Sequence, residues 1–153
     1  MRACSVFYSG MFDCEDFILP EKAVYKRNVA SDSHFHRELR NFMGDDDVLV
    51  ADIIAHGQLY KNDDLIVLAM KDCDTMEVGL VQTILIKNSQ VYFVCKVYTC
   101  IRNRLQYFES QNCDEYCKYV HFKNIVDYKP LIKRGTISKF VFMLHHRVSF
   151  KYE

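Results

Sequence analysis

Residues 78–99 have the pattern of a β-hairpin, and this hairpin constrains the fold more than any other part of the chain. Residues 78–86 and 91–99 are both rich in β-branched and aromatic side chains, which favour half-buried strands. The polar residues 87–90 interrupt this pattern, and Asn88 tolerates the positive φ that a tight hairpin turn requires. The sequence therefore predicts two long antiparallel strands at the centre of a β-rich domain.

Shorter strand patterns recur on both sides of this hairpin. Apolar, β-branched segments occur before it at residues 48–55 and 65–70, and after it at residues 116–122 and 137–146. Polar turn residues separate these segments. Six or seven short strands at such intervals predict a mainly β fold, either a small, partly open barrel or a sandwich.

One helix is predicted on the N-terminal side of these strands, at residues 31–44. Its apolar residues recur at i, i+4 and i+7, which places them on one side of a helix. A Ser or Asp side chain at residues 31–33 can cap the first turn, and Gly44 can supply a left-handed stop. The apolar positions are Phe35, Leu39 and Phe42.

The chain is expected to comprise an irregular N-terminal arm (residues 1–30), the helix (31–44) and a single β-rich domain (45–153). A chain of 153 residues can bury a core without disulfides or metal ions. No apolar run approaches the ~18 to 20 residues that a membrane-spanning helix needs, so no membrane segment is expected. The first residues lack a sustained hydrophobic region, so no signal peptide is expected either.

The seven cysteines suit an intracellular protein better than a secreted one. Secreted disulfide-bonded domains usually have an even number of cysteines at close spacings, whereas these are scattered along the chain. Reduced thiols, in the cytoplasm or the nucleus, are therefore expected.

The second arm of the hairpin suggests an aromatic binding surface. Alternate side chains of a strand share a face, and Tyr92, Lys96 and Tyr98 fall on the same face. Tyr and Lys favour half-exposed positions, and Tyr107 follows shortly after the hairpin. We predict that a protein partner, such as a chromatin tail, binds these four residues. The alternative interpretation is that the tyrosines border the core with their hydroxyls in water.

Charge is unevenly distributed, although the net charge of the chain is zero. Residues 1–117 have 12 Lys and Arg against 18 Asp and Glu, whereas residues 118–153 have 8 against 2. Such a basic segment either favours nucleic-acid binding or lies beside the acidic part and neutralises it. The basic residues of the nucleic-acid alternative are Lys118, Lys123, Lys129, Lys133, Arg134, Lys139, Arg147 and Lys151.

A second alternative is a zinc-stabilised structural domain. Cys113, Cys117 and His121 carry sulfur and nitrogen atoms of the kind that zinc prefers as ligands. At this spacing they share one face only if the segment is helical, and its aromatic neighbours favour a strand. The fourth ligand would have to come from elsewhere in the chain.

No pattern in the sequence indicates an enzyme. Cysteines and histidines are present, but no nucleophile elbow or Gly-rich phosphate loop accompanies them. The five glycines provide little backbone that could approach a phosphate closely. We therefore expect a non-catalytic protein that needs no cofactor.

Four short segments together resemble a known group of proteins. They are Ile54–Gly57, Val91–Val94, Val126–Leu131 and Phe142–His146. In this order and at these distances they resemble the β-rich C-terminal segment of uncharacterised, transposon-associated proteins that occur in many copies in fish and invertebrate genomes. The resemblance spans about residues 47 to 150.

This resemblance implies a non-enzymatic module of a mobile-element protein, located in the nucleus or the cytoplasm. The short N-terminal region would fit a truncated copy of such an element. Strand number and aromatic content also resemble those of bromo-adjacent homology and Tudor domains, which are small chromatin-reading barrels. This second likeness concerns the fold alone.

Overall fold

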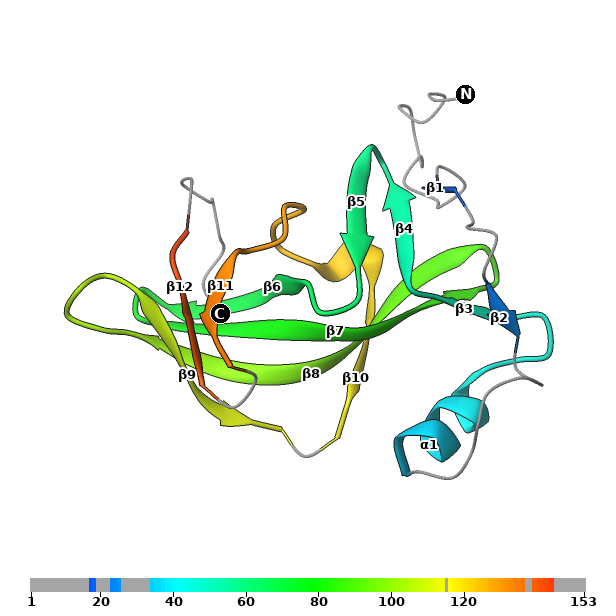
Figure 1. Ribbon diagram of the computed structural model, residues 1–153, viewed down its shortest axis with the longest axis horizontal. Coiled ribbons are helices and arrows are strands. Elements are labelled where there is room, and N and C mark those ends of the chain that lie inside the picture. The colour runs from blue at the N-terminus through cyan, green and yellow to red at the C-terminus, as the bar shows by residue number, and fades with distance from the viewer. Residues whose placement is uncertain (1–16, 19–22, 26–33, 115, 137–138, 145–153) are drawn as a thin grey trace.

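The computed structural model describes residues 17–18, 23–25, 34–114, 116–136 and 139–144. In this part of the chain the protein is mainly β, with a curled half-barrel of six antiparallel strands and one short N-terminal helix (Figure 1). The predicted fold class is confirmed, and the partly open barrel is the form that the structure adopts. No described helix has the length and apolar character needed to cross a membrane.

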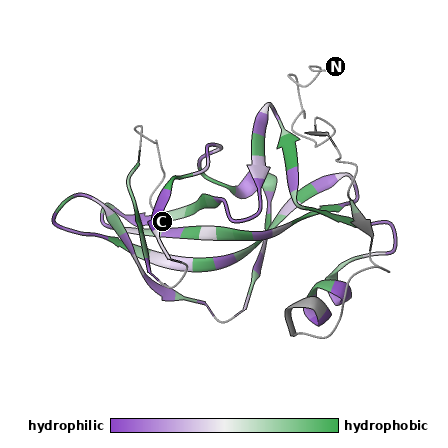
Figure 2. Ribbon diagram, in the orientation of Figure 1, coloured by the Kyte–Doolittle hydropathy of each residue, from purple (hydrophilic) through white to green (hydrophobic). Residues whose placement is uncertain are grey.

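The predicted hairpin is the longest element of the fold. It consists of β7 (Thr75–Lys87) and β8 (Gln90–Arg102), and both strands extend beyond the predicted limits. Asn88 and Ser89 form the turn with φ angles of 54° and 62°, as the polar turn sequence predicts. One irregularity of register, between Val81 and Thr83, interrupts an otherwise continuous pairing. Figure 2 shows hydrophobic residues along much of both strands.

Four shorter strands complete the half-barrel around this hairpin, in the order β6–β7–β8–β9–β12–β11. They are β6 (Leu65–Asp72), β9 (Phe108–Cys113), β11 (Lys133–Gly135) and β12 (Phe140–Phe142). The segment that leads into β11 lies beside β6, where the amides of Val126 and Leu131 donate to the carbonyls of Val67 and Leu65 over 2.9 and 2.8 Å. This segment therefore covers the edge of β6.

The hairpin changes its neighbours halfway along its length. Near its turn, β7 pairs with β3 (Val48–Val50) and β8 pairs with β10 (Lys118–His121). Farther from the turn, β7 pairs with β6 and β8 pairs with β9. We call β3, β10 and hairpin residues 84–95 the tip half. We call β6, β9, β11, β12 and the remainder of the hairpin the base half.

The region before the hairpin contributes a small second sheet, β1–β4–β5. The predicted strand at residues 48–55 is in fact two strands, β3 and β4 (Asp52–Ala55), and β4 forms a hairpin with β5 (Gln58–Lys61). Most of the predicted irregular arm lies outside the described residues. Within it, β1 (Phe17–Ile18) and β2 (Val24–Tyr25) pair with β4 and β3, so these two dipeptides are not irregular.

The predicted helix is confirmed as α1 (His34–Phe42), although its proposed N-terminal caps lie outside the described residues. The prediction that Gly44 forms a left-handed stop is wrong, because Gly44 has no positive φ. Instead, the Gly44 amide donates to the Asp47 carboxylate over 2.6 Å. The Lys87 ammonium binds the same carboxylate at 2.9 Å and also donates to the Phe42 carbonyl over 3.1 Å. These bonds fix the end of α1 to the end of β7.

The core has three parts, which differ between the two halves. In the tip half, one face of the sheet packs under β4 and β5 around Phe93, Tyr60 and Phe122, where Phe122 begins the short helix η3 (Phe122–Asn124). The opposite face packs against Leu39 of α1. In the base half, the buried side chains face the interior of the curl, and Phe140 is one of them. The tip half is thus covered on both faces.

Candidate functional site

The predicted aromatic surface is divided by the structure, and Tyr98 does not belong to any exposed surface. Its side chain is 4 % exposed and packs edge-on against Phe140, with ring centroids 4.9 Å apart. Burial raises the pKa of the Tyr98 hydroxyl to about 12. The prediction that Tyr98 is half-exposed is wrong because β12, which begins 42 residues later in the sequence, covers this part of β8.

Tyr92 and Lys96 are half-buried, as the sequence predicts, but they do not form an open aromatic face. The Tyr92 ring contacts Phe42 of α1 and His121 of β10, with centroids 6.1 and 5.0 Å apart. These contacts hold Tyr92 between the helix and the sheet. The interpretation that tyrosines border the core therefore describes Tyr92 better than a binding role does.

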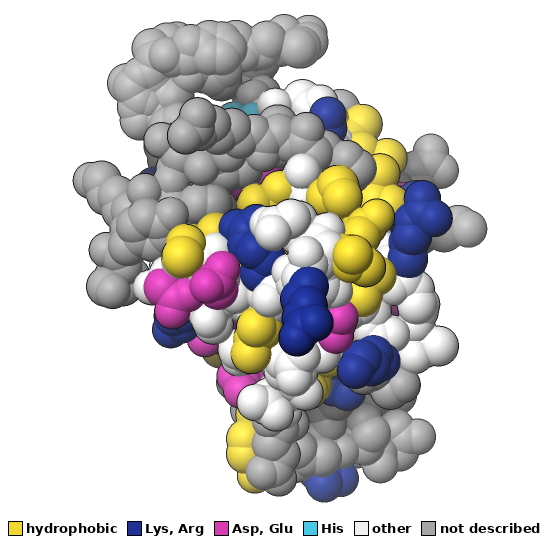
Figure 3. Space-filling model, turned by 90° about the vertical axis from the view of Figure 1, so that its left-hand side faces the viewer, with side chains coloured by type: hydrophobic (Ala, Val, Ile, Leu, Met, Phe, Trp, Pro, Cys, Tyr) yellow, Lys and Arg dark blue, Asp and Glu magenta, His cyan; other side chains and the backbone are white. Residues whose placement is uncertain are grey.

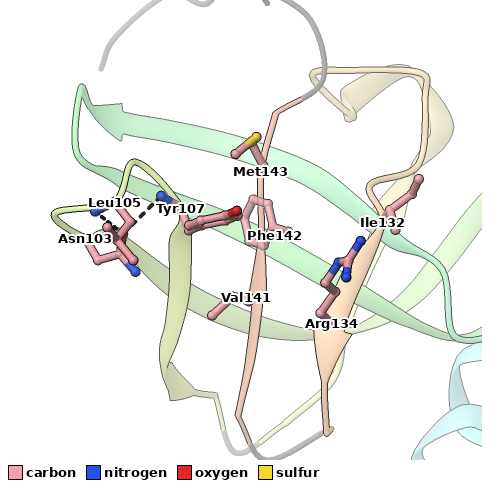
Figure 4. A pocket seen from close by; sticks show the side chains of 8 residues that line it. All are labelled: Asn103, Leu105, Tyr107, Ile132, Arg134, Val141, Phe142 and Met143. Carbon is pink, nitrogen blue, oxygen red and sulfur yellow. Dashed lines mark hydrogen bonds between the residues drawn. The ribbon is translucent and has the colours of Figure 1, made fainter.

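Tyr107 lies in a different environment, because it lines a cavity of about 600 Å³ in the base half. Figure 4 shows residues of β12 along the middle of this cavity, with Tyr107 on one side and Arg134 on the other. The eight lining residues are Asn103, Leu105, Tyr107, Ile132, Arg134, Val141, Phe142 and Met143.

Strand register explains why these side chains meet. Glu109 of β9 lies opposite Val141 of β12, and Val141 lies opposite Arg134 of β11. Cross-strand partners share a face of a sheet, and successive residues alternate between faces. The buried Phe108 and Phe142 point into the base-half core, so Glu109, Val141 and Arg134 are on the outer face. The outer face of β9, β12 and β11 is therefore the surface on which the cavity lies.

A second row of side chains follows from the same register. Tyr107, Ile132 and Met143 lie next to the ends of β9, β11 and β12, two residues from Glu109, Arg134 and Val141. All three line the cavity, as expected if the alternation of the strands continues by one residue. This row is apolar and accessible, since Ile132 is 62 % and Met143 is 40 % exposed. The surface around the cavity thus combines one row with charged residues (Glu109, Val141 and Arg134) and one largely apolar row (Tyr107, Met143 and Ile132).

The loop between β8 and β9 forms one wall of the cavity. The Asn103 side-chain oxygen accepts hydrogen bonds from the amides of Leu105 and Tyr107, at 2.9 and 3.0 Å, and its amide nitrogen donates to Glu109 at 2.6 Å. Gln106 adopts a φ of 70° in this tight turn. These bonds hold Leu105 outward, where it is 73 % exposed.

Charge at this face is unbalanced. Glu109 is bound by Asn103 and lies 4.0 Å from the Lys139 ammonium. Arg134 is exposed, and its side chain has no hydrogen bond or ion pair with any described residue. Figure 3 views the molecule from the base-half end and shows hydrophobic side chains interspersed with Lys, Arg, Asp and Glu. The face therefore offers apolar contacts together with an unpaired cation.

The predicted nucleic-acid residues do not all lie on one element or share one environment. Lys118 of β10, Lys123 of η3 and Lys129 are exposed. Lys133 is half-buried and donates to the carbonyl of Asp63 over 3.4 Å. Arg134 lines the cavity, Lys139 lies near Glu109, and Arg147 and Lys151 are outside the described residues. The structure therefore distributes the basic side chains over several elements.

The three candidate zinc ligands do not converge. Cys113 ends β9 and is exposed, and His121 belongs to β10, which is a strand and not the helix that their spacing would require. His121 Nδ1 accepts the amide of Lys123 at 3.0 Å, and Nε2 is 2.7 Å from the Gln90 side chain. No group of three Cys, His, Asp or Glu side chains in the described part of the chain could hold a metal ion.

Sequence reasoning identified Tyr107 and Arg134 but assigned them to two different functions. It missed the apolar residues of the cavity, among them Leu105, Ile132 and Met143. No local signal identified them, because Phe140–Phe142 is apolar at all three positions and its alternating burial appears only in the structure. The register that joins β9, β12 and β11 could not be derived from local sequence.

Comparisons with protein-family models, with curated proteins and with solved structures gave no match to this chain. The resemblance to transposon-associated proteins therefore stays a prediction from sequence. The site is accordingly interpreted from its own geometry.

Proposed function

We propose that the protein is a non-catalytic interaction module that binds a segment of a protein partner in the base-half cavity. The observation that supports this most directly is the group of exposed apolar side chains around a cavity of about 600 Å³. Leu105 lies in the loop between β8 and β9, Ile132 precedes β11 and Met143 follows β12, yet all three border the same cavity. Covering them would remove apolar surface from water, which is the main driving force of protein association.

The composition of the cavity favours binding over catalysis. Its lining residues include no Cys, His, Ser, Asp or Glu in the described part of the chain. A nucleophile or a general acid–base pair would need such side chains within hydrogen-bonding distance of each other. Apolar walls with a few polar groups are typical of a recognition site.

Substitution of Leu105 tests this proposal. The probe is a fluorescein-labelled pool of short synthetic peptides that are rich in Leu, Ile and Phe, and fluorescence polarisation measures its binding. Leu105→Asp should reduce affinity at least about tenfold, because it places a charge in the apolar wall. Leu59→Asp is the matched control, since Leu59 is 49 % exposed on β5, outside the cavity. Equal binding by wild type and Leu105→Asp would contradict the proposal.

A second candidate function, nucleic-acid binding, is supported by the exposed side chains of Lys118, Lys123 and Lys129, which have no ion pair with a described residue. Polarisation of labelled single-stranded and duplex oligonucleotides would test it. Affinity should fall steeply as salt concentration rises, because phosphate contacts release counterions. Absence of binding at low salt would remove this candidate.

The cellular context is also a proposal. An origin in a mobile element and a location in the nucleus or the cytoplasm rest on the sequence resemblance and on the scattered cysteines. Imaging of a tagged full-length chain would test the location.

A further inference from the structure

We infer that the cavity selects a partner segment that carries a carboxylate and an apolar side chain two residues apart in an extended chain. This inference rests on the proposed function, since it specifies the chemistry of the segment that the cavity binds. Arg134 would bind the carboxylate, and Ile132 and Met143 would contact the apolar side chain.

The spacing follows from the geometry of β11. Arg134 is the middle residue of β11, Ile132 directly precedes this strand, and both side chains line the cavity. Alternate residues of a strand are about 7 Å apart. An extended partner segment has the same repeat, so two of its alternate side chains can match Arg134 and Ile132 simultaneously. Adjacent side chains of such a segment would point to opposite faces.

The edge of the sheet favours an extended partner. Among the described strands, β11 pairs with β12 alone and is the last strand of its sheet. Arg134 and Gly135 are exposed there. Unpaired edge strands bind extended segments through backbone hydrogen bonds, while side-chain contacts provide specificity. A segment that lies along β11 would pass directly beside Arg134.

The charge around the cavity favours an acidic partner. The Arg134 guanidinium is unpaired among the described residues, whereas the nearby Glu109 carboxylate is bound by Asn103. An added carboxylate would therefore meet a cation that no described acid neutralises, and guanidinium–carboxylate pairs form short, directional hydrogen bonds. A Lys or Arg side chain at the same place would be repelled, so a basic chromatin tail is a poor partner for this cavity.

Matched peptide pools test the inference. All pools share one random background and differ at two fixed positions, with both chain orders included. The first pool has Asp or Glu two residues from Leu, Ile or Phe. The second has the same side chains adjacent, and the third has Asn or Gln in place of the acid. Fluorescence polarisation should show about tenfold tighter binding of the first pool than of either other pool to the wild-type protein.

Variants of Arg134 complete the experiment. Arg134→Gln should abolish the preference for the first pool without changing the circular dichroism spectrum, because the side chain is exposed. Arg134→Lys should retain part of the preference for the first pool. Lys118→Gln removes a similar charge from β10 and should leave the preference unchanged.

The outcomes separate the two proposals. If the first and third pools bind equally and Leu105→Asp weakens both, the cavity binds apolar peptides but the acidic preference is wrong. If no pool binds, both proposals are overturned. A further outcome is that a single-stranded oligonucleotide competes with the first pool, with an oligonucleotide affinity that depends steeply on salt and on Arg134. In that case Arg134 binds nucleic acid and the inference is overturned.

Discussion

The tip half and the base half are built on the same two strands but differ in how many faces of the sheet are covered. In the tip half, β3 is buried at all three positions, because β4–β5 covers one face and α1 covers the other. In the base half, β12 alternates, with Phe140 and Phe142 buried and Val141 half-exposed. A sheet with one covered face leaves the other free for contact with a partner.

This difference separates stability from recognition within one small domain. Polar side-chain contacts join elements in both halves: Lys87 binds Asp47 in the tip half, and Ser110 of β9 accepts the Phe140 amide of β12 in the base half. What distinguishes the base half is a group of exposed apolar side chains around one cavity, beside an arginine that no described acid neutralises. Substitutions should therefore affect folding when they fall in the first region and binding when they fall on the outer face of the second.

The sharpest test of this comparison uses one valine from each half. Val94 is fully buried beneath α1, whereas Val141 lies on the outer face of β12. Val94→Asn should lower the free energy of unfolding by about 3 kcal/mol, because an amide replaces buried apolar surface without a designed hydrogen-bond partner. Val141→Asn should lower it by about 1 kcal/mol or less. Urea denaturation measures both, and equal losses would show that the two faces are equally covered.

A smaller difference is expected between two lysines. Lys87 binds the buried Asp47 carboxylate at 2.9 Å, whereas in the base half the exposed Lys71 lies 3.5 Å from the half-buried Glu77 carboxylate. Lys87→Met should cost about 2 kcal/mol, because it leaves a buried carboxylate without its cation. Lys71→Met should cost about 0.5 kcal/mol, the usual value for a surface pair. Thermal and urea unfolding would measure the loss of unfolding free energy in each variant. A larger loss in Lys71→Met than in Lys87→Met would contradict the proposed difference between the two halves.

The smallest expected effect is a pH dependence that belongs to the tip half. Burial, followed by the nearby Lys123 charge, lowers the pKa of His121. The unfolded chain therefore binds a proton at higher pH than the folded chain does. Above about pH 6.5, His121 is neutral in both states and the free energy of unfolding has its full value. The free energy of unfolding decreases as the pH falls from there towards the pKa of His121 in the folded protein, because only the unfolded chain gains the proton.

The measurement is the free energy of unfolding of wild type and His121→Gln as the pH falls below about 6.5. The wild type should lose more stability than the variant over this interval. Amide exchange should show the loss in β10 and near Gln90, because the His121 ring binds the Gln90 side chain. Equal pH profiles for the two proteins would assign the dependence to another group.

Much of the fold could be predicted because its central element is local. Alternation and a turn-forming Asn88 define the hairpin without information from distant residues. The helix was likewise predictable from apolar spacing. The division of residues 48–55 into β3 and β4 was not, because Asp52 is the only polar residue in the segment and the break at Ala51 depends on packing in two different sheets.

The candidate site was less predictable because it depends on contacts between distant segments. Tyr98 and Tyr92 share a strand and a sequence pattern, yet β12 covers the first and α1 borders the second. Whether a tyrosine in a strand is exposed is decided by what packs on it. For the same reason Arg134 could be recognised as basic, but its position beside Ile132 and Val141 required the register of β11 and β12.

The covered edge of β6 has a consequence for the synthesis of the protein. Leu65 of β6 receives its hydrogen bond from Leu131, which is 66 residues later in the sequence. At ribosomal rates of roughly 5–20 residues per second, about 3 to 13 seconds pass between the synthesis of Leu65 and that of Leu131. During this time the edge resembles the unpaired strands that nucleate aggregation. The nascent chain is therefore most vulnerable between the emergence of β6 and that of Leu131, and this is the interval in which a chaperone would protect it.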